Sequence, residues 1–268
     1  RAVPGGARGA HQARARGIAP EFAEYRPYRQ GDDPRRVDWK LLARSDRAYI
    51  RLAPDRAVLG TTILVDASAS MAFPEQGRSK WSLACEMAVA LAAVAHASAD
   101  PVGLVVAHAG GVMAMRPRTR RGVIAEMART LDGIAPYGSA PLAPALSAVR
   151  GRIVIVTDCL GDLDDVRRAA RAIVLQGGEV TAVHVVSRLE VDPPGGPRLV
   201  VDPEAPLVVR ALTDEGRAGY AGRFAAWRAL VARGWLDDGV AYTEARDSEG
   251  AERVVRRVVA MSQRAGHA

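Results

Sequence analysis

The chain has 268 residues, of which 49% are hydrophobic and 25% are charged. These values are typical of a folded globular protein of one or two domains, and they exclude a disordered chain, a coiled coil and a fibrous repeat. The most apolar stretch, at residues 87–95, is much shorter than the roughly 20 residues that a membrane-spanning helix needs. We therefore predict no membrane span in this chain.

The formal net charge of +7 is concentrated near the N-terminus, where the first 56 residues hold 13 Arg and Lys against 7 Asp and Glu. Basic chains often bind nucleic acid, but nearly all basic residues along this whole chain are Arg. We interpret this as a composition bias and expect no nucleic-acid partner. The N-terminus lacks the apolar core of a secretory signal, which predicts a cytoplasmic location.

Residues 1–56 contain no obvious helix of useful length and interleave aromatic residues with charges. We interpret them as an appendage that packs on a main domain of residues 57–268. The sequence GDDPRR at 31–36 has the composition of a turn. Its charges, together with Arg26 and Asp38, are expected to form buried ion pairs. The alternative is a docking surface for another protein, made of Arg26, Arg35, Arg36 and Trp39.

From residue 60 onward, short runs rich in Val and Ile alternate with helical patterns. The predicted strands are 61–68, 102–109, 152–158, 179–186 and 240–245, and the predicted helices are 80–98, 141–150, 164–176, 213–233 and 250–263. This alternation predicts an α/β fold with a doubly wound, mainly parallel sheet flanked by helices. Residues 187–210 interrupt it with prolines and a glycine pair, which predicts a β-hairpin-like insertion.

The first of these strands runs into the sequence DASAS, which places oxygen-bearing side chains at Asp66, Ser68 and Ser70. Asp158 follows the third predicted strand in the same way. In doubly wound sheets, ligands bind beyond the carboxyl ends of the strands, so we expect these four side chains to converge there. Carboxylate and hydroxyl oxygens suit a hard cation, Mg²⁺ or Mn²⁺.

The same residues also have a structural interpretation. Asp and Ser directly after a strand commonly cap the next helix, and any one of them is often no more than a cap. Lys80 begins the next predicted helix and is expected to be a solvated lysine, with pairing to Asp66 as the alternative.

These motifs resemble a known fold and a known family. DASAS followed by Met71, the TD pair at 157–158 and the alternation of strands and helices resemble the von Willebrand factor A fold with its metal-ion-dependent adhesion site. The bacterial domain-of-unknown-function family numbered 58 is a closer resemblance. It is carried by EFAEYRPYRQGDDPRRVDWKLLARSDRAYIR, VDASASM, the SK pair at 79–80, HVVSRLEVDPP and VVDPEAP, and it extends over residues 20–262.

The resemblance implies a non-enzymatic protein-interaction module that works with a MoxR-type AAA+ ATPase and an unknown client protein in a chaperone-like system. By position, it implies that Asp66, Ser68, Ser70 and Asp158 are metal ligands. The chain departs from the adhesion-site pattern in YGSAPLAPAL, where Ala140 stands at the position of a ligand Thr. Ser139 or a water is the expected substitute, and metal binding is expected to be weak or absent.

A Mg²⁺-dependent phosphohydrolase that uses Asp66 as its nucleophile is the alternative function, because an Asp at the end of the first strand also serves aspartyl-phosphate chemistry. The haloacid dehalogenase pattern requires a second Asp two residues later, and Ser68 occupies that position. No GxSxG, Walker-type or GxGxxG motif is present, which disfavours a serine hydrolase and a nucleotide-binding protein.

Overall fold

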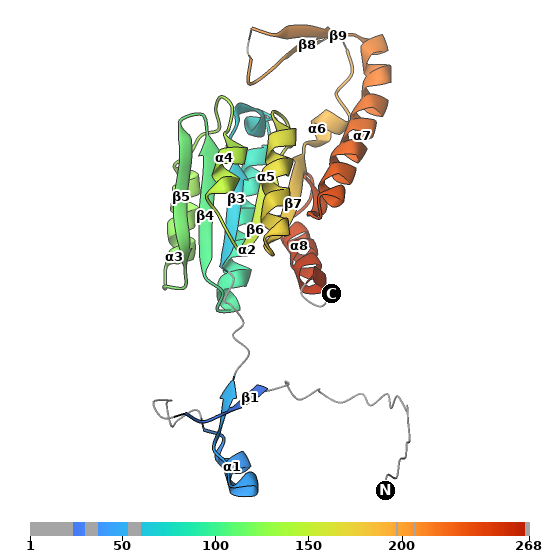
Figure 1. Ribbon diagram of the computed structural model, residues 1–268. Coiled ribbons are helices and arrows are strands. Elements are labelled where there is room, and N and C mark those ends of the chain that lie inside the picture. Colours follow the sequence, from blue (N-terminus) through green and yellow to red (C-terminus); the bar gives the residue numbers. More distant parts are fainter. Residues whose placement is uncertain (1–23, 30–36, 53–59, 197, 206, 266–268) are drawn as a thin grey trace, which may run out of the picture. The chain divides into compact units, whose positions relative to one another are not determined.

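The computed structural model describes residues 24–29, 37–52, 60–196, 198–205 and 207–265 (Figure 1). The chain divides into two compact units, Arg1–Ala57 and Val58–Ala268. How the first unit packs on the second stays a prediction. None of the helices in the described part of the chain combines the length and the apolar character needed to cross a bilayer.

The first unit contains a two-stranded antiparallel sheet, β1 (Glu24–Pro27) and β2 (Tyr49–Leu52), and one helix, α1 (Trp39–Ser45). No helix was predicted in this unit. Asp38 explains why one forms, since its side chain accepts hydrogen bonds from the backbone N–H groups of Lys40 (3.0 Å) and Leu41 (2.9 Å) and so caps the first turn.

The second unit is built on a six-stranded sheet with the order β10-β7-β6-β3-β4-β5. Its strands are β3 (Thr61–Asp66), β4 (Val102–His108), β5 (Gly111–Arg118), β6 (Arg152–Thr157), β7 (Glu179–Val186) and β10 (Ala241–Arg246). All neighbouring pairs are parallel except β4 and β5. The predicted doubly wound, mainly parallel sheet is confirmed.

Helices cover both faces of this sheet, as Figure 1 shows. One buried apolar cluster joins the sheet to α2 (Lys80–Ala97), α3 (Val123–Asp132) and α8 (Ala251–Ala265). A second cluster joins it to α4 (Leu142–Ser147), α5 (Leu163–Leu175) and α7 (Asp214–Asp237). Because both faces are buried, the central strands read as unbroken apolar runs in the sequence.

The elements of this unit that were not predicted include β5 and α3. β5 lies at the edge of the sheet and alternates between half-buried and exposed side chains, so it forms no apolar run. It also contains Pro117, which a strand tolerates at a sheet edge. An edge strand of this composition gives a weak signal.

The predicted insertion contains a short helix, α6 (Arg188–Val191), and an antiparallel hairpin of β8 (Arg198–Val201) and β9 (Val209–Leu212). The hairpin confirms the sequence prediction, although it ends two residues later than expected. Figure 1 shows it beyond one end of the main sheet, between α6 and α7 along the chain.

Candidate functional site

Two neighbouring parallel strands, β3 and β6, end in buried carboxylates. Asp66 is the last residue of β3 and is 1% exposed, and Asp158 directly follows β6 and is 2% exposed. The loop after β3 forms a short 3-10 helix, Ala69–Ala72, which holds Ser68 and Ser70 in buried positions beside the strand end. The structure therefore brings the four predicted side chains to one edge of the sheet, which we call the carboxyl edge.

The carboxylate of Asp66 accepts hydrogen bonds from two neutral groups. The backbone N–H of Ser68 donates to its Oδ1 (2.9 Å), and the hydroxyl of Thr157 donates to its Oδ2 (2.7 Å). The hydroxyls of Ser68 and Ser70 lie 3.1 Å apart. Burial and the charge of Asp158 raise the pKa of Asp66 to about 7, although the hydrogen bonds from Thr157 and Ser68 oppose the rise. Asp66 therefore changes charge close to neutral pH.

A buried cation neutralises Asp158. The Nζ atom of Lys80 lies 2.8 Å from Oδ2 of Asp158 and 2.6 Å from Oε1 of Glu190, and Lys80 is buried. The expectation of a solvated Lys80 is wrong. Burial alone would lower the pKa of Lys80, but the charges of Asp158 and Glu190 outweigh burial and raise it. Lys80 is therefore charged, and it pairs with Asp158 rather than with Asp66.

Glu190 reaches this edge through a capping box at the start of α6. The Ser187 hydroxyl accepts from the backbone N–H of Leu189 (3.2 Å), and Glu190 Oε2 accepts from the backbone N–H of Ser187 (2.7 Å). The Ser187 hydroxyl also donates to Asp247 after β10 (2.5 Å). The sequence S-R-L-E carries the S-x-x-E signature of such a box, so this signal for Glu190 was present in the sequence.

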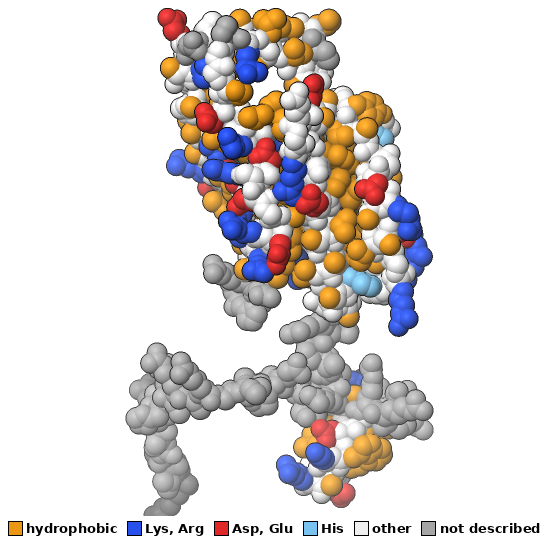
Figure 2. Space-filling view, turned by 180° about the vertical axis from the view of Figure 1, so that it is seen from behind, with side chains coloured by type: hydrophobic (Ala, Val, Ile, Leu, Met, Phe, Trp, Pro, Cys, Tyr) orange, Lys and Arg blue, Asp and Glu red, His pale blue; other side chains and the backbone are white. Residues whose placement is uncertain are grey.

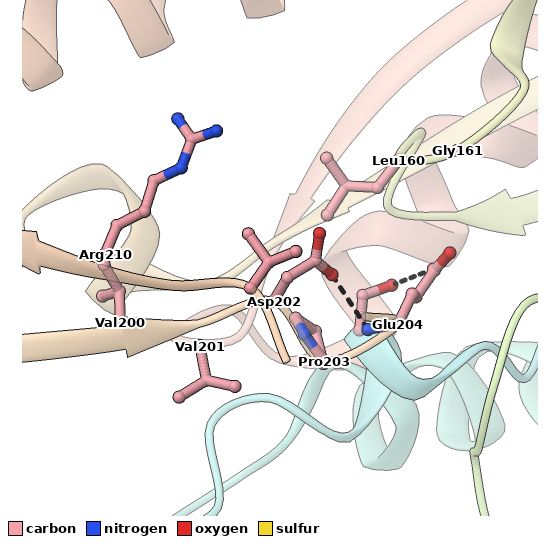
Figure 3. Close-up of a pocket in the computed structure, with 10 residues that line it drawn as sticks. Leu160, Gly161, Val200, Val201, Asp202, Pro203, Glu204 and Arg210 are labelled. Atoms are coloured by element: carbon pink, nitrogen blue, oxygen red, sulfur yellow. Dashed lines mark hydrogen bonds between the residues drawn. The ribbon is translucent and has the colours of Figure 1, made fainter. Parts of the chain in front are cut away.

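The hairpin supplies another carboxylate. The Ser70 hydroxyl donates to Oε1 of Glu204 at 3.3 Å, and Figure 3 shows Glu204 turned toward this contact. Burial, followed by the charge of Asp158, raises the pKa of Glu204. A cavity of about 530 Å³ lies here between the hairpin and the strand ends. Its lining residues are Ser70, Leu160, Gly161, Val200, Val201, Asp202, Pro203, Glu204, Val208 and Arg210.

The loop that carries Ser139 and Ala140 lies against the loop after β3. The backbone N–H of Tyr137 donates to the carbonyl of Ala67 (3.2 Å), and the N–H of Ala69 donates to the carbonyl of Gly138 (2.7 Å). Ser139 is exposed, whereas Ala140 is half-buried and packs against the second apolar cluster. The role of Ser139 as a substitute ligand stays a prediction.

The second predicted surface belongs to the N-terminal unit. Arg26 is half-buried in β1, and Trp39 is 63% exposed at the start of α1. Arg35 and Arg36 lie outside the described residues, as do Asp32 and Asp33. The ion-pair network and the docking surface proposed for this block both stay predictions.

At the carboxyl edge, the oxygen atoms near Asp66 are better suited to bind a hard cation than those near Asp158. Asp66, Ser68 and Ser70 offer the carboxylate and hydroxyl oxygens that Mg²⁺ and Mn²⁺ prefer. On the other side, Oδ2 of Asp158 is bound to Lys80. Within the described residues, no group of three or more His, Cys, Asp or Glu side chains is arranged to hold a metal ion. A cation here would depend on Asp66 and the two serines.

Comparison with known families agrees with this architecture. Residues 24–229 match the family described as "Protein of unknown function DUF58". The chain belongs to the DUF58 family. It is also 32% identical over 236 residues to an uncharacterized protein of Mycobacterium tuberculosis, a match that covers 84% of this chain and 74% of the relative.

Solved structures resemble the fold of this DUF58 chain. An aerotolerance-related membrane protein of Bacteroides fragilis has a TM-score of 0.50 and 17% identity, and the match covers 74% of this chain and 96% of that protein. The SpRpn10 VWA domain, at a TM-score of 0.42 and 13% identity, covers 74% of this chain and 93% of that domain. The family match confirms the predicted DUF58 family, and the observed sheet confirms the predicted α/β fold.

Proposed function

We propose that this DUF58 chain is a non-enzymatic protein-interaction module that binds its partner at the carboxyl edge of the main sheet. One observation carries the proposal: three loops of the site region each present an exposed large apolar or aromatic side chain. Phe73 after the 3-10 helix is 38% exposed, Tyr137 is 54% exposed and Leu160 after β6 is 41% exposed. Exposed groups of this kind, gathered around one site, mark protein interfaces.

The hairpin enlarges this surface. Val200 and Val201 of β8 and Val208 before β9 are all exposed and line the cavity beside Leu160. Figure 2 shows hydrophobic side chains at the end of the main unit where the hairpin lies. A two-stranded hairpin is marginally stable in water on its own, so a partner that covers these valines would stabilise it. We call Phe73, Tyr137, Leu160, Val201 and Val208 the carboxyl-edge surface.

The contacts of Asp66 favour binding over hydrolysis. A phosphohydrolase needs this carboxylate free to attack a phosphorus atom. Asp66 is 1% exposed, and both of its oxygens accept hydrogen bonds, from Ser68 and Thr157. These contacts support a non-enzymatic role.

The partner in this proposal is a MoxR-type AAA+ ATPase, and the third component is a client protein, both implied by the family resemblance. A cytoplasmic location belongs to the same proposal, since the ATPase draws on cytoplasmic ATP. A Mg²⁺ or Mn²⁺ ion would be held by Asp66, Ser68 and Ser70, with Ser139 or water in place of the Thr that Ala140 replaces. It would supply a positive charge for a partner's oxygen ligand.

A binding experiment tests the proposal. A purified MoxR-type AAA+ ATPase from the same organism is titrated against the full chain and against Leu160→Ser and Tyr137→Ser. Each of these two variants is expected to weaken binding by roughly tenfold, the effect of losing one anchoring side chain.

Leu175→Ser is the matched control. Leu175 is 77% exposed and ends α5, which returns from the carboxyl edge to the opposite edge of the sheet. Its substitution should leave binding unchanged. Equal losses in all three variants, or none in any, would contradict the assigned surface. Mg²⁺-dependent phosphatase activity that is abolished by Asp66→Asn would overturn the non-enzymatic role.

A further inference from the structure

We propose that Lys80 is a built-in cation of the carboxyl edge, which neutralises Asp158 and Glu190 so that this half of the site needs no divalent metal ion. The inference concerns the same edge as the proposed function, but it holds whichever protein binds there. It assigns to a side chain of this protein the role that the family resemblance gives to a metal at Asp158.

The surroundings of the Lys80 ammonium are those of a cation-binding site. Its Nζ lies 2.8 Å from Asp158 and 2.6 Å from Glu190, and the ring centroid of Phe73 lies 5.9 Å away. An ammonium has three N–H donors, and two carboxylates and an aromatic ring are the groups that attract it. The side chains of Lys80 and Asp158 are 1% and 2% exposed, so water does not screen the pair.

The position of Lys80 in its helix supports a role in the site. Lys80 is the first residue of α2, after the N-cap Ser79, whose hydroxyl accepts from Ser82. A positive charge is unfavourable at a helix N-terminus, where the dipole is positive. The backbone N–H of Lys80 donates to the carbonyl of Phe73 (2.9 Å), which fixes the start of α2 beside the loop after β3. The helix dipole of α2 disfavours a lysine at this position, and the two carboxylates explain why one is found there.

The ammonium limits what a divalent ion can do here. An ion that bound Asp158 would have to displace Lys80 or lie close to its charge in a buried region, where like charges repel strongly. Without Lys80, the buried carboxylate of Asp158 and the partly buried carboxylate of Glu190 would lose the cation between them, beside Asp66 and the two serine hydroxyls. Such a set of oxygens attracts Mg²⁺ or Mn²⁺. Loss of Lys80 should therefore make the chain bind a divalent ion more tightly than the natural chain does.

The test compares the response to metal of the full chain and of Lys80→Met. The Tm of each is measured in chelator and then in about 10 mM MgCl₂ or MnCl₂ at constant ionic strength, since an ion that binds only the folded state raises the Tm. We expect several degrees of increase for Lys80→Met and, for the natural chain, less than about one degree. Calorimetric titration should show at least roughly tenfold tighter Mn²⁺ binding by Lys80→Met.

Arg152→Met is the matched control, because Arg152 also lies between two carboxylates, Asp100 and Glu179, at the other end of β6. It should show no gain in metal response. An equal gain in both variants would mean that any lost positive charge recruits the ion, and it would overturn the inference.

Asp158→Asn in the natural background separates this inference from the proposed metal site. Binding of Mn²⁺ that is lost in Asp66→Ala but kept in Asp158→Asn agrees with the inference. Binding that is lost in both variants would overturn the inference while keeping the predicted metal site.

A double variant keeps the test decisive if Lys80→Met does not fold. Lys80→Met with Glu190→Gln removes one charge of each sign and leaves Asp158 without its cation. It should also gain a Tm response to Mn²⁺ above that of the natural chain. A folded double variant with no such gain would overturn the inference.

Discussion

The two ends of β6 carry the same arrangement of charges in different surroundings. At the start of the strand, Arg152 lies between Glu179 (2.8 Å) and Asp100 (3.4 Å), and all three side chains are about 30% exposed. At the other end, Lys80 lies between Asp158 and Glu190, and the exposed fractions of the three side chains are 1%, 2% and 18%. Exposed ion pairs contribute little because water and salt screen them, whereas breaking a buried pair leaves a charge with no solvent. Burial therefore decides which of the two clusters contributes more to the stability of the fold.

The comparison is sharpest for the substitution of each cation. Lys80→Met should lower the free energy of unfolding by about 3–5 kcal/mol, the usual cost of a buried charge that loses its partner. Arg152→Met should lower it by about 0–1 kcal/mol, the range for exposed pairs. Urea unfolding in the presence of a chelator measures both values.

Removing the stranded charges is the control for Lys80. Adding Asp158→Asn and Glu190→Gln to Lys80→Met should recover part of the lost stability, because no unpaired carboxylate remains. If the triple variant were less stable than Lys80→Met alone, packing rather than charge would explain the loss. Similar losses for Lys80→Met and Arg152→Met would contradict the comparison itself.

A second test extends the comparison to a buried group that is kept neutral. His184 of β7 is 1% exposed, its Nδ1 lies 2.8 Å from the hydroxyl of Tyr242, and its ring meets Trp227 edge-on. Burial lowers the pKa of His184 from 6.5 to about 4. The unfolded chain therefore binds a proton at His184 below pH 6.5 that the folded chain binds only near pH 4.

The sign of the pH effect follows from this difference. The contribution of His184 to stability is fully present above pH 6.5 and is lost as the pH falls toward 4, a total of about 3 kcal/mol. His184→Leu should flatten the pH dependence of unfolding across this range. Urea unfolding of both proteins at several pH values measures the difference, and equal slopes would contradict the assigned state of His184.

Much of the fold was readable because the central strands are covered on both faces. β3, β4, β6 and β7 appear in the sequence as Val- and Ile-rich runs. The predicted bounds of these strands and of β10 agree with the structure to within two residues. β5 was missed because an exposed edge strand needs no apolar run. α1 was missed because its residues show little apolar periodicity and none of them is buried. The capping residue Asp38 is the main local feature that favours this helix.

At the carboxyl edge, the sequence predicted the residues that directly follow an apolar strand, but not the contacts that other segments make with them. Asp66 and Asp158 each follow an apolar run, and parallel neighbours bring their ends together. The contact of Lys80 with Asp158 joins residues 78 positions apart, and that of Ser70 with Glu204 joins residues 134 apart. Neither spacing has a local sequence pattern, so both contacts emerge only when the helix starts and the hairpin are placed in space.

The last test concerns Asp66, a buried carboxylate that, unlike Asp158, forms no salt bridge within the described residues. Thr157 donates to Oδ2 of Asp66 at 2.7 Å and accepts from the N–H of Cys159 at 3.1 Å. Thr157→Val keeps the shape of the side chain and removes both bonds. The cost should be about 1–3 kcal/mol at alkaline pH, the range for a buried group that loses its hydrogen bond.

The pH dependence of that cost separates charge from packing. The pKa of Asp66 rises from 3.8 in the unfolded chain to about 7 in the folded protein, so its ionisation opposes folding increasingly between these values and in full above the higher one. The Thr157 hydrogen bond favours the ionised form, so its loss raises the folded pKa further and costs most where Asp66 is charged. Urea unfolding with a chelator should show a larger loss for Thr157→Val near pH 8 than near pH 5.5. A loss that is the same at both values would mean that Thr157 stabilises the loop through Cys159 alone, and that Asp66 draws its hydrogen-bond support from the backbone of Ser68.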